Sequence, residues 1–441
     1  MIHTYPMLRS LDPHQQRIGY LGALASVATR GMDYAEALLS RYQDLLFEKI
    51  YEDEEQFGNM LARVPQERRT KLLKKMDRSI EEEPSAILRG LEDKNNWLYK
   101  SEFWLYEACM PSPRGFLSKD KIQRTIDLAR WTGVLQPTND LSETGYILQY
   151  LIKEISGEQS GQIHPNLLYA QARSSLPVLY FRILFSSEML FPFLVYEFVD
   201  RYDNKKPLAT RGEDGLLRAA VDRMIACIGE PNDPEDILAF REITDFRNSI
   251  EKSIKTEENY LRPRMEILVD LGVFGRKGDI EDKQSEFVWL VTDKTRAIAQ
   301  SLRKYFSGKY NIQEYLDQGL FRSLSEVYGS GYRKVDGLEG RLYWFARALR
   351  KIGRDFGFTP GRTGALMACL MAWEEGKILE VSEVFDAVYE AARSDWAKYF
   401  HYSGGSRFDR EFLIRVDDEF LTIIQERIKS DLPKNNNGGG R

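Results

Sequence analysis

The stretch that decides the fold is Arg262–Leu302, which reads RPRMEILVDLGVFGRKGDIEDKQSEFVWLVTDKTRAIAQSL. Pro263 suits the first turn of a helix, because the backbone N–H that proline lacks has no partner there. Apolar residues then follow at helical spacing up to Gly272, which is typical of a helix end. The sequence therefore predicts a helix that begins near Pro263 and ends at Gly272.

A short hairpin and a second helix are predicted to follow. Residues 273–274 begin an extended piece, and residues 275–285 are polar and charged, as in a hairpin tip. Residues 287–291 alternate and are rich in strand-forming side chains. Thr292 can cap a closing helix over residues 293–302. The predicted order is therefore helix, strand, charged hairpin, strand, helix.

This order resembles the second half of the winged-helix superfamily. The residues that carry the likeness are Leu268–Phe274 (LVDLGVF) and Trp289–Arg296 (WLVTDKTR), which are similar to the recognition helix and wing of bacterial transcriptional regulators. The resemblance covers roughly a tenth of the chain. It implies a compact module that binds DNA or docks a protein, and likeness of fold alone does not decide between the two.

A similar pattern occurs about 140 residues earlier, which suggests duplication or convergent use of one small fold. Ser118 can cap a helix over residues 119–131, Gly133 stops this helix, and an apolar helix follows at residues 146–155. Only residues 136–140 separate the two pieces. The sequence therefore predicts a second winged-helix-like module whose hairpin is too short for a real wing.

Basic side chains on the two modules are the candidate contacts to DNA phosphates. The outward helix positions of the first module are net basic, although Asp120 and Asp127 lie among them. The basic residues of the second module are offset by Glu266 and by an acidic hairpin tip, which favours protein docking there. The candidate nucleic-acid-binding residues are Lys119, Lys121, Arg124, Arg130, Arg262, Arg264, Arg276 and Lys277.

A carboxylate followed by Glu-x-Lys is the metal-binding pattern of many nucleases. Asp355 with Glu375-Gly-Lys377 matches it, but those nucleases place the motif on a strand, whereas Glu375 and Gly376 are predicted to end a helix. The four histidines have no metal-ligand spacing, and the sequence contains no GxxxxGK[ST] motif. We therefore expect no catalytic residue, bound metal or cofactor, and we keep a metal-dependent nuclease as the third hypothesis.

A glycine- and serine-rich loop is a candidate phosphate site. Ser403, Ser406, Arg407 and Arg410 belong to the stretch SGGSRFDR, whose backbone N–H groups and guanidinium groups could hold a phosphate. The alternative is a tight turn before a strand over residues 412–416. In that case a third small helix–loop–strand module would lie near the C-terminus.

Composition limits the function further. The chain has 441 residues and a formal net charge of −5, whereas a dedicated nucleic-acid binder is often strongly basic. No apolar run reaches the roughly 18 residues of a membrane helix, since Arg182, Glu188 and Glu197 interrupt the best candidate. The N-terminus lacks a signal-peptide pattern, and three scattered cysteines form no CxxC pair. We expect a cytoplasmic protein without membrane contact.

The fold class expected from these patterns is mainly α, a multidomain helical protein with two winged-helix-like (α+β) modules. The first functional hypothesis is a non-catalytic subunit that binds double-stranded DNA, and the second is a scaffold that docks protein partners or self-associates. A prokaryotic regulatory or anti-phage defence complex is a plausible setting. The expected domains are 1–110 (helical), 111–160 (first module), 161–254 (helical insertion), 255–306 (second module), 307–432 (helical) and 433–441 (disordered tail).

Overall fold

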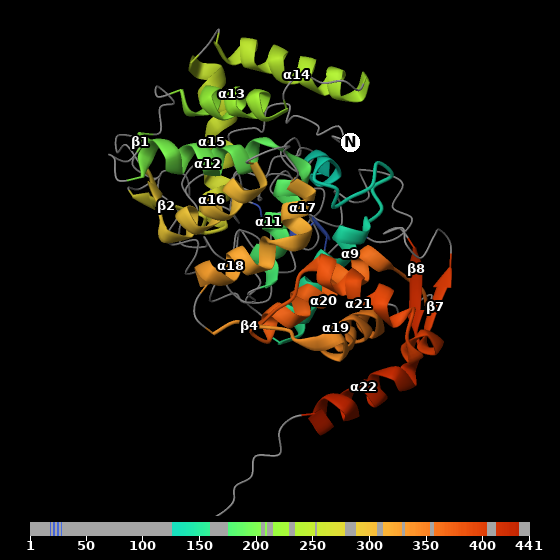
Figure 1. The fold of residues 1–441 in the computed structure, drawn as a ribbon. Coiled ribbons are helices and arrows are strands. Elements are labelled where there is room, and N and C mark those ends of the chain that lie inside the picture. Colours follow the sequence, from blue (N-terminus) through green and yellow to red (C-terminus); the bar gives the residue numbers. More distant parts are fainter. Residues whose placement is uncertain are drawn as a thin grey trace, which may run out of the picture. The chain divides into compact units, whose positions relative to one another are not determined.

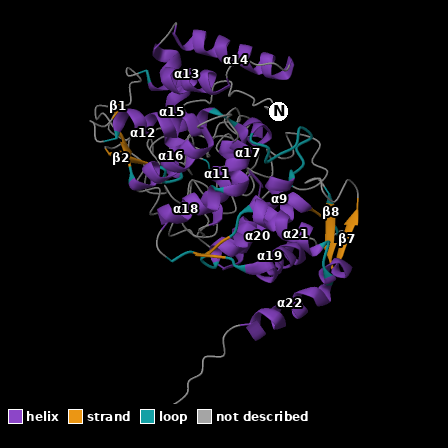
Figure 2. Cartoon of the chain, in the orientation of Figure 1, coloured by secondary structure: helices purple, strands orange, loops and turns teal. Residues whose placement is uncertain are grey.

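The computed structural model is mainly helical, as expected, and contains three small sheets among the residues that it describes (Figure 1, Figure 2). The chain divides into two compact parts, one of Met1–Ala172 with Ile183–Thr295 and the other of Arg173–Arg182 with Arg296–Arg441. The structure describes residues 18, 21–22, 24–25, 28, 126–158, 175–203, 208–209, 215–228, 234–251, 254–277, 288–306, 312–328, 331–352, 357–403 and 412–431.

The N-terminal turn module, residues 126–158, joins two helices through one tight turn. Its first helix stops at Gly133, whose φ of 69° lies in the left-handed region. An isolated antiparallel bridge then pairs Leu135 with Leu141, and α9 (Glu143–Glu158) follows. The predicted hairpin that is too short for a wing is therefore confirmed.

Helix α9 begins against this turn, and the contact requires a glycine. A Cβ on Gly145 would lie 2.1 Å from the carbonyl oxygen of Val134, a distance that no side chain could accept. The hydroxyl of Ser142 accepts the N–H of Gly145 at 3.0 Å and donates to the carbonyl of Gly133. Ser142 therefore caps α9 and also fixes its first turn to the end of the preceding helix.

The central sheet module, α12 to α16, contains the hairpin predicted from the sequence. β2 (Phe274–Lys277) pairs antiparallel with β3 (Val288–Val291), with Phe274 opposite Val291. The prediction is confirmed, although residues 275–277 belong to β2 and not to the tip. The helices of this module are α12 (Leu190–Tyr202), α13 (Leu216–Ile228), α14 (Pro234–Glu251), α15 (Ile254–Asp270) and α16 (Asp293–Phe306).

A third strand joins this sheet from the segment expected to be a separate insertion. β1 (Leu208–Ala209) pairs antiparallel with β3, so the strand order is β1-β3-β2. Helices α13 and α14 pack on α15, and α12 packs on β3. The domain boundary expected at residue 254 is therefore wrong, because residues on both sides of it build one sheet and one core.

Helix α15 differs from the prediction at its start. It begins at Ile254, so Pro263 lies inside the helix and not in its first turn. Inside a helix, proline removes the backbone N–H that would bond the carbonyl four residues earlier. In the same turn, Arg264 Nη1 donates to the carbonyl of Tyr260 at 2.6 Å. The local pattern placed the helix start too late because proline is most common in the first turn.

The charged residues that interrupt the most apolar stretch of the sequence are all ion-paired. That stretch forms α11 (Ser175–Ser187) and α12. The pairs are Arg182 with Asp317 at 2.6 Å, Glu188 with Arg264 at 2.7 Å, and Glu197 with Arg201 at 3.4 Å and with Arg223. Among the described helices, none alone has the length and apolar composition of a membrane span. Helices α11 and α12 together have that length and composition, but the chain bends by 103° between them.

The C-terminal sheet module, α19 to α22, contains a second three-stranded sheet. β7 (Phe400–Ser403) and β8 (Leu413–Val416) lie side by side and antiparallel (Figure 1), and β5 (Thr359–Pro360) pairs with the other edge of β8. The order β5-β8-β7 repeats that of the central sheet module. Its helices are α19 (Gly337–Ile352), α20 (Gly361–Glu374), α21 (Val381–Ala391), the short η2 (Asp395–Tyr399) and α22 (Asp418–Asp431).

Two more helices precede this module, and a small parallel sheet of two strands, each of two residues, lies beside its helices. α17 (Ile312–Gln318) and α18 (Leu320–Tyr328) come before α19. β4 (Arg333–Lys334) pairs in parallel with β6 (Lys377–Ile378), which lies between α20 and α21. The strand expected at residues 412–416 is confirmed as β8, and the third module suggested by the sequence has a complete sheet.

Candidate functional site

Several of the candidate residues lie outside the described part of the chain. These are Lys119, Lys121, Arg124, Asp355, Ser406, Arg407 and Arg410. For Arg276 and Lys277 only the backbone is described, and it pairs in β2 with Trp289 and Val288. The structure therefore tests the remaining candidates, Arg130, Arg262, Arg264, Ser403, Glu375 and Lys377.

Arg130 is half-buried and holds the turn of its own module. Its Nε donates to Asn139 Oδ1 at 2.8 Å, and its Nη1 lies 3.1 Å from Asp127 Oδ1. Asn139 has a φ of 68° in the left-handed region, which asparagine tolerates better than most residues. The guanidinium of Arg130 thus fixes a strained turn position, and its contact with nucleic acid stays a prediction.

Arg264 does not face solvent, so the expectation that it contacts DNA is wrong. Its exposed fraction is 0%, and its guanidinium makes two bonds to Glu188, from Nη2 to Oε1 at 2.7 Å and from Nε to Oε2 at 2.9 Å. Glu188 is also buried. A charge in the interior needs such a partner, because burial without one is costly. This arginine is a core residue.

The opposite face of α15 is also enclosed. Glu266, which the sequence places among the outward residues that offset the basic side chains, is buried and accepts the indole N–H of Trp289 at 3.0 Å. Trp289 belongs to β3 and is itself fully buried. From Leu261 to Leu268 only Arg262 is half-exposed. The segment Leu261–Leu268 of α15 therefore lies between Glu188 and the sheet, and within this segment the helix presents no broad surface to a partner.

Helix α21 takes the corresponding place before the hairpin of the C-terminal sheet module, and its surface is accessible. Asp386 and Glu390 are exposed on it, and Glu383 is half-buried with Lys334 at 2.8 Å. The inward positions are apolar, namely Val381, Val384, Phe385, Ala387, Val388 and Ala391. This acidic face could not be predicted from the helical pattern alone, because the sheet that orients the helix is completed by a strand of only two residues, β5.

Glu380, at the N-terminus of α21, is a buried carboxylate between two helices. It accepts the backbone N–H of Arg322 at 2.8 Å in the first turn of α18, and its own N–H donates to Glu383 at 3.1 Å. Burial raises the pKa of Glu380 to about 7, and the negative charge of Glu383 acts in the same direction, whereas the backbone N–H groups of Arg322 and Phe321 lower it. Glu380 therefore changes charge near neutral pH.

Glu375 and Gly376 of the nuclease hypothesis lie where the alternative interpretation places them, at the end of a helix. α20 ends at Glu374, Glu375 follows as its C-cap, and Gly376 has a φ of 70°. The carboxylate of Glu375 forms an ion pair with Arg347 at 2.5 Å. Among the described residues, no three His, Cys, Asp or Glu side chains are grouped to hold a metal ion. The predicted glycine-capped helix end is therefore confirmed.

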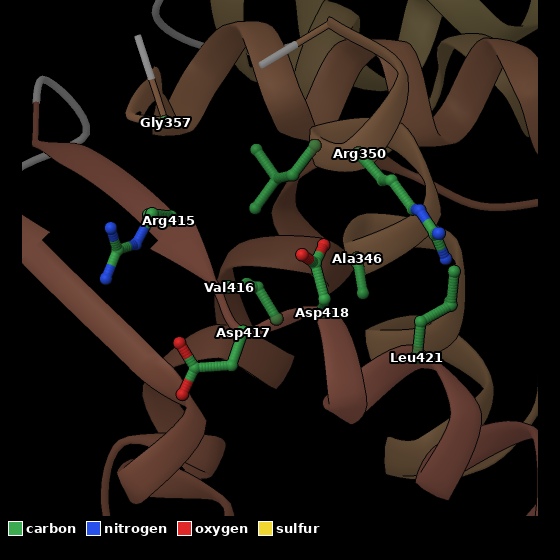
Figure 3. A pocket seen from close by; sticks show the side chains of 9 residues that line it. Ala346, Arg350, Gly357, Arg415, Val416, Asp417, Asp418 and Leu421 are labelled. Atoms are coloured by element: carbon green, nitrogen blue, oxygen red, sulfur yellow. The ribbon is translucent and has the colours of Figure 1, made fainter. Parts of the chain in front are cut away.

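Ser403 lies at the end of β7, opposite Leu413, and is exposed. The candidate phosphate loop thus connects the two strands of a hairpin. The tight turn of the alternative interpretation lies outside the described residues. The other end of this hairpin borders a pocket of about 570 Å³. Figure 3 shows Arg350 and Arg415 on opposite sides of Asp418 in this pocket, and Asp417 also lines it. Two arginines and two aspartates balance in charge.

No protein-family model, curated protein or solved structure matches this chain.

Proposed function

We propose that the chain is a non-catalytic adaptor in the cytoplasm, which docks protein partners through winged-helix-like modules. The repeated strand order, β1-β3-β2 and β5-β8-β7, supports two such modules, each with its hairpin between the second and third strands. The observation that carries the proposal concerns the helix before each hairpin. The segment Leu261–Leu268 of α15 is enclosed, and α21 exposes the carboxylates of Asp386 and Glu390.

Reading DNA requires the reverse of this arrangement. A helix in the major groove must expose side chains to base edges and place basic residues near the flanking phosphates. The acidic face of α21 would be repelled by phosphate, whereas it is complementary to a basic protein surface. Tyr389 lies half-buried beside Glu390 and offers an aromatic contact of the kind enriched in protein interfaces.

The partner surface is tested by reversing its charge. The chain is tagged, isolated from its native host with nuclease treatment, and its co-purifying proteins are compared with those of Asp386→Lys/Glu390→Lys. We expect the double variant to lose its partner, because like charges across an interface are strongly unfavourable. The matched control is Glu419→Lys/Glu426→Lys, which reverses two exposed carboxylates on α22 and should retain the partner.

Two results would overturn the proposal. One is purification of the wild-type chain as a lone monomer, and the other is identical partner recovery with both double variants. A gel shift at low salt decides the rival hypothesis in parallel. Duplex binding that falls steeply with salt would mean that Lys119, Lys121 and Arg124, or another basic surface, serve DNA.

A further inference from the structure

The pocket of about 570 Å³ at the end of the β7–β8 hairpin is a candidate ligand site (Figure 3). We call it the hairpin pocket. It lies among α19, Gly357 before β5, β8 and the start of α22, and α19 packs on both β8 and α22. Its apolar lining consists of Ala346, Leu349, Val416 and Leu421. This volume, and an apolar lining with a few charged groups, are typical of small-molecule sites.

Three exposed charged side chains line the hairpin pocket without pairing with one another. Arg350 comes from α19 and Arg415 from β8, and Asp418 begins α22 between them (Figure 3). Among the residues that the structure describes, none of the three forms an ion pair. The fourth charged residue, Asp417, lies 2.7 Å from His401 Nε2 through its carboxylate. Opposite charges in one pocket attract each other, so their separation here needs a structural cause.

The packing of Arg415 supplies this cause. Its guanidinium lies over the ring of Phe358, with Cζ 5.5 Å from the ring centroid, a favourable contact for a cation. The stem of Arg415 passes close to Gly357, where an added Cβ would lie 3.3 Å from Cδ. Gly357 has a φ of 70°, which glycine adopts without strain. An aromatic ring and a glycine, and not a carboxylate, therefore position Arg415, so its N–H donors can serve a ligand.

We propose that the hairpin pocket binds a zwitterionic small molecule, namely a free α-amino acid with an apolar side chain. Two arginines and two aspartates line the pocket, so a ligand with only one sign of charge would be repelled by part of the lining. An amino acid offers its carboxylate to the guanidinium of Arg415 and its ammonium group to the carboxylate of Asp418, and both contacts are charge-assisted hydrogen bonds. Its side chain packs on the apolar lining.

The test titrates the full-length chain with free amino acids. Calorimetry measures the affinity of leucine, valine, methionine and phenylalanine at constant ionic strength. The amino acid that binds best is then compared with two analogues that each lack one charge, namely the corresponding amine without the carboxylate and the corresponding carboxylic acid without the ammonium group. We expect saturable binding of at least one amino acid. Each analogue should bind about tenfold more weakly or worse, because it leaves one charged side chain of the pocket without its partner.

A charge-neutralising variant tests the contact to the ammonium group. Asp418→Asn should weaken binding of the amino acid about tenfold or more, but not binding of the carboxylic acid analogue, which has no ammonium group. The matched control is Glu419→Gln. Glu419 is the next residue of α22, is also exposed in its first turn and does not line the hairpin pocket, so this variant should bind the amino acid as the wild type does.

A fold check keeps the result interpretable. Circular dichroism and the unliganded melting temperature show whether Asp418→Asn is folded, and Arg415→Gln, also at an exposed position, replaces it if it is not. The proposal is overturned if no amino acid binds the wild type, if both analogues bind as tightly as the amino acid, or if the pocket variant and Glu419→Gln bind it equally well. Because Asp386 and Glu390 do not line the hairpin pocket, failure of the adaptor proposal would leave this result unchanged.

Discussion

The central and C-terminal sheet modules share one strand order but place their charges differently. In the central sheet module, the helix before the hairpin carries Arg264 and Glu266 into the interior, where they meet Glu188 and Trp289. In the C-terminal sheet module, the corresponding helix keeps an apolar inner face and turns its acidic residues outward. The same strand order thus accompanies an enclosed helix segment in the central sheet module and an exposed helix surface in the C-terminal sheet module.

This difference separates a structural role from a binding role. A buried ion pair fixes α15 in one orientation, since each partner would be costly to bury alone. Apolar packing under α21 leaves its outer residues free to vary without exposing a buried charge. Partner specificity can therefore lie on α21, whereas changes to the inner charges of α15 would first destabilise the fold.

The largest predicted effect breaks the enclosed helix. Arg264→Met leaves Glu188 buried without its guanidinium, so we expect the free energy of unfolding of the central sheet module to fall by about 3–5 kcal/mol. Urea unfolding followed by far-UV circular dichroism measures the change. The C-terminal sheet module should keep its partner-binding surface in conditions where Arg264→Met is still folded.

A double variant distinguishes the ion pair from simple packing. Arg264→Met with Glu188→Met removes both charges, and it should recover most of the stability that the single variant loses. If the single and double variants were equally destabilised, the loss would come from the shape of the arginine side chain and not from its charge.

The helix ends and helix starts around the turns of both predicted modules could be predicted from single residues in the sequence. Gly133 and Gly272 end their helices with φ of 69° and 67°, and a hydroxyl follows each hairpin as a helix cap. The helix over Leu216–Ile228 also agrees with its apolar periodicity. These features are local, because a left-handed turn or a cap depends on residues within one or two turns of the chain.

The remaining features depend on contacts that no local pattern records. β1 and β5 have two residues each, too few for an alternation to be visible, so the sheets they complete were not predicted. Arg264 and Glu188 are 76 residues apart, and periodicity alone makes an arginine look exposed.

The second prediction concerns pH and the C-terminal sheet module alone. Because Glu380 has a pKa of about 7 when folded, above its ordinary value of 4.5, the folded state binds a proton more tightly than the unfolded state. Its contribution to stability is therefore complete below about pH 4.5 and is lost as the pH rises through 7. In the wild type, we expect this titration to lower the free energy of unfolding by on the order of 2–3 kcal/mol between pH 5 and pH 8. Glu380→Gln should remove this pH dependence.

The measurement is the free energy of unfolding of the wild type and of Glu380→Gln at several pH values between 5 and 8, and the difference between the two curves gives the contribution of Glu380. Glutamine keeps one oxygen to accept the N–H of Arg322 but carries no charge, so the variant should be the more stable protein at pH 8. Arg264→Met should show the same pH slope as the wild type, since it leaves Glu380 intact. Parallel curves for the wild type and Glu380→Gln would contradict the predicted titration.

The smallest predicted effect compares the two residues that precede the helices after the two hairpins. Thr292 Oγ1 accepts the N–H of Thr295 at 3.1 Å and donates to the carbonyl of Val273 at 3.1 Å, before β2. In the C-terminal sheet module, Asp417 precedes α22 and its carboxylate lies 2.7 Å from His401 Nε2 on β7. Both residues connect the closing helix to the first hairpin strand.

These two connections differ in burial, so they should differ in strength. Thr292→Ala removes a half-buried cap and should cost about 1 kcal/mol, and Thr292→Ser, which retains the hydroxyl, should cost less. Asp417 and His401 have side chains that are 34% and 40% exposed, and exposed pairs contribute at most about 1 kcal/mol. Thermal unfolding should therefore rank Thr292→Ala below Asp417→Asn in stability. The reverse order would mean that the contact between Asp417 and His401 contributes more to the stability of the C-terminal sheet module than its exposure indicates.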